Sequence, residues 1–298
     1  MSTLKECAAY SGFRYVRGRL VLSLVSNDGK ITRIRYLDTT TDEIREEPCG
    51  AVFLAAGALQ TGAIFLRTLK AARPDISAET EGLMDTTVVR VPFVQLRGVG
   101  QPPATQSFQF NRLIVGMVTE TALWPRYLHG ELLHLTGLLY YPLIENLPFD
   151  SRLSKKVFFA LRSALGAATF FFPDRITSGN HQAIADHSGR WEKVHLRYRE
   201  SEDKEHYIRQ SVSRARSALR QLACVPRGAV RSSPGAGIHY AGTVPMGDGP
   251  KRCDPTGRSN LFSNLYIADG AAFPSLPSKS ITMSLAAHAT RVARNAPL

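Results

Sequence analysis

The fold class is set by the stretch AVFLAAGALQTGAIFLRTLK, residues 51–70. It begins with a short, wholly apolar run, Ala51–Leu54, and passes through the small-residue turn AAGAL (55–59) into a helix-forming segment. This pattern predicts a buried strand that leads directly into a helix, which is the repeating unit of α/β folds. A helix N-terminus placed in this way presents backbone N–H groups to a phosphate or a ring system. The turn alone is equally typical of close packing.

Strands are predicted on both sides of this unit. The segments GRLVLSLVS (18–26) and ITRIRYLDT (31–39) alternate apolar and polar residues around an Asn-Asp-Gly-Lys turn, which predicts a hairpin. Beyond about Pro74, three strand-like segments follow one another without helices between them: TTVVRVPFVQL (86–96), QSFQFNRLIVGMV (106–118) and GELLHLTGLLYYPL (130–143). Such an order favours an antiparallel sheet, inserted after the first α/β piece.

Two later segments have the apolar spacing of one helix face. Residues 201–224 carry Ile208, Val212, Ala215, Leu219 and Leu222, and residues 280–296 carry Ile281, Leu285, Ala289 and Val292. The many arginines of the first segment predict a solvated face, with nucleic-acid binding as the minority interpretation. We therefore expect no nucleic acid as a partner.

Composition narrows the class of protein. The chain has 298 residues, 44% of them apolar, which is enough to bury a core in one large or two ordinary domains. Its formal charge of +12 favours anionic partners such as a nucleotide cofactor, a nucleic acid or an acidic membrane face. The four cysteines lack the spacing of a zinc site or a disulfide framework, so we expect no metal. The N-terminus shows no signal-peptide pattern, which predicts a cytoplasmic protein.

The longest apolar run is VFFALRSALGAATFFF, residues 157–172. It is too short and too polar to span a bilayer, and it predicts a helix packed in or over the core. Because Arg152, Lys155 and Lys156 precede it, a helix in weak contact with an anionic membrane surface remains the alternative.

Four ordered blocks mark the C-terminal part: IHYAGTVPMG (238–247), CDPTGR (253–258), NLYIADGAAFP (264–274) and LPSKSITMSLAAHATRVA (276–293). Together they resemble the C-terminal signature of the glucose-methanol-choline (GMC) family of flavin oxidoreductases. The earlier VFLAAGALQTGAIFLR (52–67) resembles the strand-turn-helix of the same family.

The resemblance implies an α/β fold of mixed α+β character, in which an incomplete, Rossmann-like FAD-binding domain is interrupted by an antiparallel substrate domain. Residues 1–75 would form the first part of the FAD domain, 76–229 the substrate domain and 230–298 the C-terminal part of the FAD domain. The implied cofactor is FAD, and the implied substrate is a small-molecule alcohol such as a sugar or polyol. The sequence does not name the electron acceptor.

The resemblance also assigns site residues. Oxidation of an alcohol needs a base of near-neutral pKa within hydrogen-bond reach of the hydroxyl, and His239 is the predicted base. Ser280 and Lys279 stand where the family usually has a second His or Asn, so they are the predicted donors to the substrate oxygen or the reduced flavin; Lys279 is equally typical of a solvated surface lysine. The expected cofactor contacts are Ala56, Gly57, Ala58, Gly242, Asp269, Gly270, Ala271 and Thr282.

One family feature is missing. No strand followed by Gly-x-Gly-x-x-Gly, the pyrophosphate-binding fingerprint, occurs in the sequence. We therefore expect, as the leading explanation, that this chain is a truncated part of a longer enzyme. The alternatives are a complementing chain that supplies the ADP-binding half and a loss of activity. The alternative function is a non-catalytic remnant that acts as a basic binding or scaffold protein.

Overall fold

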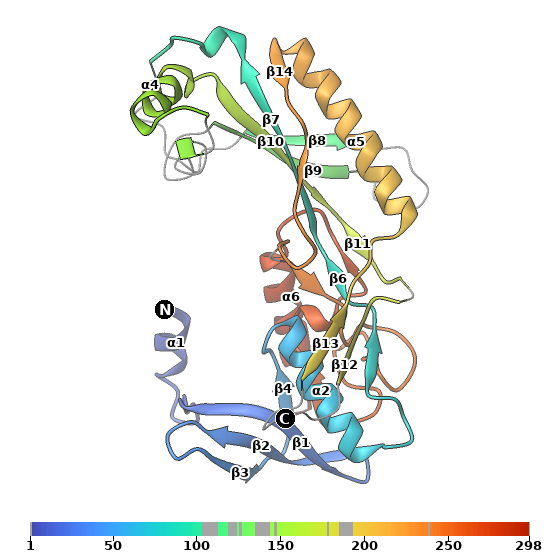
Figure 1. The fold of residues 1–298 in the computed structure, drawn as a ribbon. Coiled ribbons are helices and arrows are strands. Elements are labelled where there is room, and N and C mark those ends of the chain that lie inside the picture. The colour runs from blue at the N-terminus through green and yellow to red at the C-terminus, as the bar shows by residue number, and fades with distance from the viewer. Residues whose placement is uncertain are drawn as a thin grey trace.

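A computed structural model describes residues 2–102, 113–118, 124, 127–134, 144–145, 148–177, 179–184, 193–237 and 239–297. The molecule is elongated (Figure 1). One end holds a three-stranded sheet, and the other holds a six-stranded sheet covered by a long helix. The fold is a mixed α/β arrangement with antiparallel sheets, as the sequence predicts. A short helix, α1 (Ser2–Cys7), precedes the first sheet.

The first sheet consists of β1 (Arg19–Asn27), β2 (Lys30–Asp38) and β3 (Glu43–Pro48), all antiparallel. The predicted hairpin is confirmed, since Asn27 pairs with Lys30 across the turn. Asp28 and Gly29 both have positive φ there, which matches the twist of a two-residue hairpin loop.

The strand and helix predicted over residues 51–70 are also confirmed, as β4 (Val52–Leu54) and α2 (Ala58–Ala72). β4 pairs in parallel with β17 (Leu265–Ile267), which joins segments more than 200 residues apart. Phe65, Leu66 and Leu69 of α2 are buried in the core that these elements share with β1. This parallel pair places the turn after β4 beside the turn after β17.

The larger sheet has the order β14 (Cys224–Pro226), β7 (Thr87–Gln95), β10 (Leu165–Phe172), β9 (Tyr127–His134) and β8 (Leu113–Val118), and β15 (Val230–Arg231) also pairs with β7. The strand prediction at 86–96 corresponds to β7. Of the stretches 106–118 and 130–143, residues 106–112 and 135–143 lie outside the described residues. α5 (Glu202–Gln221) covers one face of the sheet, with Tyr207, Ile208, Ala215 and Leu219 buried. Leu222, which the sequence places on this face, is exposed because the helix ends before it.

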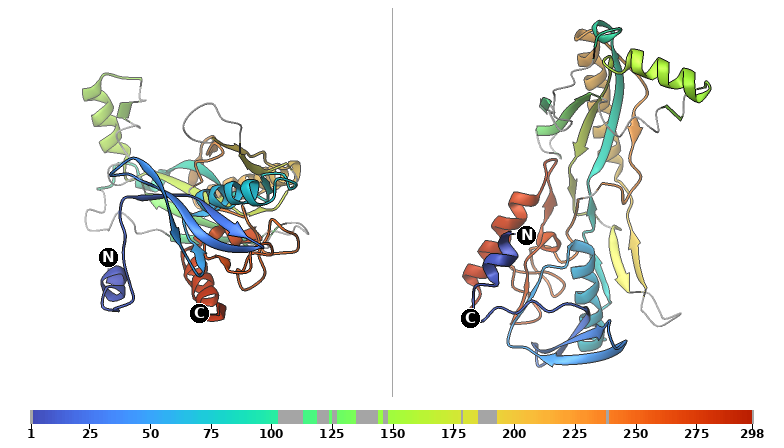
Figure 2. Two further views of the ribbon diagram at one scale, coloured as in Figure 1. Left: turned by 90° about the horizontal axis from the view of Figure 1, so that it is seen from below. Right: turned by 90° about the vertical axis from the view of Figure 1, so that its left-hand side faces the viewer.

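The helix predicted over residues 157–172 is wrong in its second half. α4 (Ser151–Leu161) ends at Leu161, and residues 165–172 form the central strand β10. Because β10 pairs with a strand on each side and is buried over most of its length, its apolar run lacks the alternation of a half-exposed strand. α4 projects away from the rest of the molecule (Figure 2). Within the described ranges, no helix combines the length and apolarity that crossing a membrane requires.

Short strands and a terminal helix link the two ends. β5 (Glu79–Glu81), β12 (His181–Ile184) and β13 (Val194–Arg197) form a small sheet, and two further pairs join β6 (Met84–Asp85) to β16 (Tyr240–Ala241) and β11 (Asp174–Arg175) to β18 (Ser275–Leu276). The predicted C-terminal helix is confirmed as α6 (Thr282–Asn295), with Ile281 and Val292 buried. Residues of β6, β16, β18 and the start of α6 share one apolar cluster.

Candidate functional site

The N-terminus of α2 is open on one side. Ala55, Ala56 and Gly57 are exposed, and Gly57 has a φ of +86° with no atom within 4 Å of where a side chain would begin. No side chain of the helix's own first residues caps it, and its first turn contains no acidic residue. Exposed backbone with open space beside it at a helix N-terminus allows close approach of an anionic or hydroxyl-rich group.

Asp269, at the end of β17, lies against this N-terminus. Its Oδ2 accepts hydrogen bonds from the Gly57 N–H at 2.8 Å and from the Thr61 hydroxyl at 2.6 Å. Its Oδ1 accepts a third bond from the Ala271 N–H at 2.9 Å. The carboxylate is 8% exposed, and its negative charge stands where the helix dipole favours one. Asp269 therefore acts as the N-terminal cap of a helix 200 residues earlier in the sequence.

The backbone around Gly270 and Ala271 faces inward. This segment forms a short 3-10 helix, η3 (Gly270–Ala272), that is fully buried. The Gly270 carbonyl accepts from the Gly242 N–H at 3.0 Å, and the Ala271 carbonyl accepts from the Val244 N–H at 2.9 Å. These main-chain groups are buried, whereas Ala56 and Gly57 are exposed even though their N–H groups donate to Thr61 and Asp269.

Gly242 is required by the neighbouring strand. It has a φ of +81°, and a Cβ there would overlap the carbonyl oxygen of Gly82 and lie 2.5 Å from Met84 Cε. The next residue, Thr243, donates its hydroxyl proton to the Ala58 carbonyl at 2.5 Å. The loop after β16 is thus wedged between β6 and α2.

His239 precedes β16 and is half-buried. Its carbonyl accepts from the Thr86 N–H at 3.2 Å, while its imidazole makes no hydrogen bond to any described residue. Burial lowers the pKa of His239 below its usual 6.5. The ring is therefore neutral near pH 7 and has an unprotonated nitrogen with which to accept a proton.

The segment before α6 contains one anchored residue, Ser278, followed by the predicted residues Lys279, Ser280 and Thr282, which are exposed. The Ser278 hydroxyl accepts from the His129 N–H and donates to the Tyr127 carbonyl, both at 3.3 Å, and so ties this segment to β9. Lys279 Nζ lies 5.1 Å from the centroid of the Tyr127 ring. Ser280 is exposed, and its hydroxyl is 3.3 Å from that of Thr282, which is exposed as well.

The structure brings the elements of the three predicted catalytic residues together. Ala241 of β16, Leu276 of β18 and Ile281 at the start of α6 all belong to the same apolar cluster. His239 precedes the first of these elements, and Lys279 and Ser280 lie between the other two.

A buried charged network beside β16 escaped the sequence analysis. Lys204 of α5 is 1% exposed, and its Nζ lies 3.3 Å from Asp174 Oδ1 and donates to the Tyr198 hydroxyl at 2.9 Å. The Tyr198 hydroxyl in turn donates to Asp174 Oδ2 at 2.7 Å. Burial lowers the pKa of Lys204 and raises that of Tyr198. The sequence could have predicted the burial of Lys204, since this residue lies four positions before Ile208 and therefore on the same, buried helix face.

Comparison with known proteins agrees with these features. Residues 185–289 match the family model described as GMC oxidoreductase. The fold resembles pyridoxine 4-oxidase from Mesorbium loti, with a TM-score of 0.56 and 17% identity over 92% of this chain and 56% of that one. It also resembles an FAD-dependent oxidoreductase from Chaetomium thermophilum, with a TM-score of 0.58 and 13% identity over 97% of this chain and 62% of that one. The chain thus spans less than two thirds of either structure. No curated protein matches it.

Proposed function

Because residues 185–289 match the family model described as GMC oxidoreductase, we propose that this chain forms part of an FAD-dependent enzyme that oxidises the CH–OH group of a small alcohol. The observation that carries the proposal is the placement of His239. The residue lies in the matched region, is half-buried and neutral near pH 7, and has no hydrogen-bond partner for its imidazole among the described residues.

The chain's own residues fit one part of the FAD molecule better than another. Exposed backbone at Ala56 and Gly57, with open space beside Gly57, suits the phosphate or ribityl portion. Gly242, Gly270 and Ala271 fit less well as direct contacts, since they are buried whereas Ala56 and Gly57 are exposed. When bound, FAD supplies the acceptor for the hydride that leaves the alcohol carbon.

We assign a separate chemical role to each of the predicted catalytic residues. His239 accepts the hydroxyl proton of the alcohol as a general base. The exposed hydroxyls of Ser280 and Thr282 lie at the N-terminus of α6, where they can donate to a substrate or cofactor oxygen. The Lys279 ammonium, held over the Tyr127 ring, places a positive charge beside them that would stabilise negative charge on that oxygen.

The test uses flavin reduction by alcohols in the protein encoded by the complete reading frame, with His239→Gln as the variant. We expect a loss of about 10²- to 10⁴-fold in the reduction rate, which is the usual contribution of a general base. His195→Gln, at an exposed position on β13, is the matched control and should leave the rate unchanged. A protein that never binds flavin would contradict the proposal, and an unchanged rate in His239→Gln would remove this residue from the mechanism.

A second candidate function rests on an arginine-lined surface cavity. Arg209, Arg216 and Arg220 of α5, together with Arg231, line a cavity of about 370 Å³. This arrangement suits the carboxylates of an acidic protein partner and fits the alternative of a basic binding protein. If that alternative holds, Arg209→Glu together with Arg220→Glu should abolish salt-sensitive partner binding without affecting flavin reduction.

A further inference from the structure

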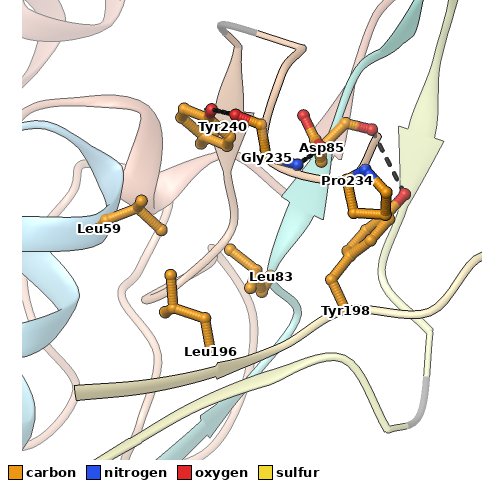
Figure 3. A pocket seen from close by; sticks show the side chains of 8 residues that line it. All are labelled: Leu59, Leu83, Asp85, Leu196, Tyr198, Pro234, Gly235 and Tyr240. Atoms are coloured by element: carbon orange, nitrogen blue, oxygen red, sulfur yellow. Dashed lines mark hydrogen bonds between the residues drawn. The ribbon is translucent and has the colours of Figure 1, made fainter. Parts of the chain in front are cut away.

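A cavity of about 400 Å³ lies beside the β6–β16 pair (Figure 3). Leu59 from the first turn of α2, Leu83 beside β6 and Leu196 of β13 supply apolar walls, and Tyr198 and Tyr240 supply two rings. Tyr240 of β16 is among the residues that line this cavity, and His239 is not. The volume lies within the range of small-molecule sites.

Asp85 is the charged residue in the wall. It is 5% exposed, and its Oδ2 accepts a hydrogen bond from the Gly235 N–H at 2.7 Å. Its Oδ1 is buried and has no hydrogen-bond partner in the part of the chain that the structure describes. A buried carboxylate oxygen without a partner is costly, and such groups normally bond to a donor.

The nearby lysine does not meet this need. The Lys204 ammonium interacts with Asp174, the Tyr198 hydroxyl and the main-chain carbonyl of Asp85. These three contacts use all three of its protons. The Asp85 carboxylate therefore receives no hydrogen bond from this ammonium, and no side chain among the described residues bonds to it. Burial accordingly raises the pKa of Asp85.

We propose that this cavity binds a small organic cation, with a primary ammonium group paired with the Asp85 carboxylate and an apolar or aromatic body against the leucines and Tyr240. An ammonium supplies both the missing donor and the missing positive charge. The apolar walls exclude a fully hydrated metal ion in favour of an amphipathic molecule. The site is distinct from the one proposed for flavin chemistry, because the imidazole of His239 lies outside its lining.

The test compares phenethylammonium with 2-phenylethanol, which has nearly the same shape without the charge, by calorimetric titration of the 298-residue protein. We expect the cation to bind about tenfold more tightly or better, since hydrogen bonds to charged groups contribute about 1.5–3 kcal/mol. Asp85→Asn should remove this preference. Asp75→Asn removes the same charge at an exposed site and should preserve it.

A second variant covers the case in which Asp85→Asn fails to fold. Leu196 is 51% exposed, so Leu196→Trp can be accommodated while its ring narrows the cavity and leaves the carboxylate in place. We expect this variant to lose phenethylammonium binding. Equal binding of the alcohol and the cation, absence of binding to the unaltered protein, or a preference that survives in Asp85→Asn or Leu196→Trp would each overturn the proposal.

Discussion

Replacing Asp269 by Asn tests whether this carboxylate holds the apoprotein together. The carboxylate accepts three hydrogen bonds, two on Oδ2 and one on Oδ1. An asparagine amide keeps one acceptor oxygen and turns the other position into a donor. The Thr61 hydroxyl can rotate to accept from that donor, but the N–H groups of Gly57 and Ala271 cannot. One of these two backbone donors therefore loses its partner in either amide orientation.

The magnitude follows from that count. An unsatisfied buried donor costs about 1–3 kcal/mol, and the remaining bonds lose the strength that the charge gives them. Removing a negative charge from the N-terminus of α2 costs about 0.3–1 kcal/mol more. We expect Asp269→Asn to lower the free energy of unfolding by about 3 kcal/mol, a large share of the roughly 5–15 kcal/mol of a typical domain.

Urea denaturation followed by circular dichroism, without added flavin, measures this change. Thr61→Val removes the hydroxyl that donates to Asp269 and accepts from the exposed Ala56 N–H, which water can still satisfy, and should cost about 1 kcal/mol as the matched comparison. If Asp269 served only as a cofactor ligand, Asp269→Asn would leave the flavin-free protein unaffected. A loss below about 0.5 kcal/mol would therefore refute the structural role.

Three further predictions concern packing, charge and pH. Gly242→Ala should destabilise the protein by more than about 2 kcal/mol in the same denaturation assay, because its Cβ would overlap the Gly82 carbonyl at a left-handed position; an unchanged midpoint would contradict this. Lys204→Met should cost about 3–5 kcal/mol by leaving Asp174 buried without its ammonium, and adding Asp174→Asn should recover part of the loss; no recovery would count against the pair. Burial lowers the pKa of His288 below 6.5, so the unfolded chain binds this proton first. The stability that neutral His288 provides above about pH 6.5 is therefore lost as the pH falls through its folded pKa, and His288→Gln should flatten the decline in unfolding free energy measured from about pH 7 to about pH 5.

Local sequence patterns correctly predicted the structural features that depend on residues close together in the chain. The hairpin over residues 18–39 was predictable from its alternation and its Asn-Asp-Gly turn, and the unit over residues 51–70 from an apolar run followed by a small-residue turn. The buried face of α5 was predictable from its spacing, apart from Leu222 beyond its end. These features are set by periodicity and turn chemistry within about twenty residues.

The features that escaped prediction depend on partners far away in the sequence. Strand β10 looks helical by composition because sheet neighbours, not alternation, determine its burial. Asp269 resembles a ligand contact until β17 is found beside β4, which places its carboxylate on Gly57. Lys204 resembles a surface lysine until Asp174 from another element is brought to it. The residue spacing within one segment cannot predict contacts between segments that lie far apart in the sequence.

The four C-terminal blocks are hydrogen-bonded to one another. Main-chain bonds join the loop after β16 to η3, from Gly242 to Gly270, Val244 to Ala271 and Met246 to Ala272. The second block then bonds to β17 through Ile267 and Gly257, and the His288 Nε2–H of α6 donates to the Ile267 carbonyl at 2.8 Å.

Most residues in these C-terminal blocks therefore hold the surrounding fold together, and few of them are left to contact a ligand. His239 is half-buried, with no hydrogen-bond partner for its ring among the described residues, and Ala56, Gly57 and Ser280 are exposed. These four residues are accessible to a ligand, whereas Gly242, Asp269, Gly270 and Ala271 are buried and bonded within the chain. Substitutions in the first group should alter ligand binding or rate while the fold stays intact, and substitutions in the second should lower the free energy of unfolding even without a ligand.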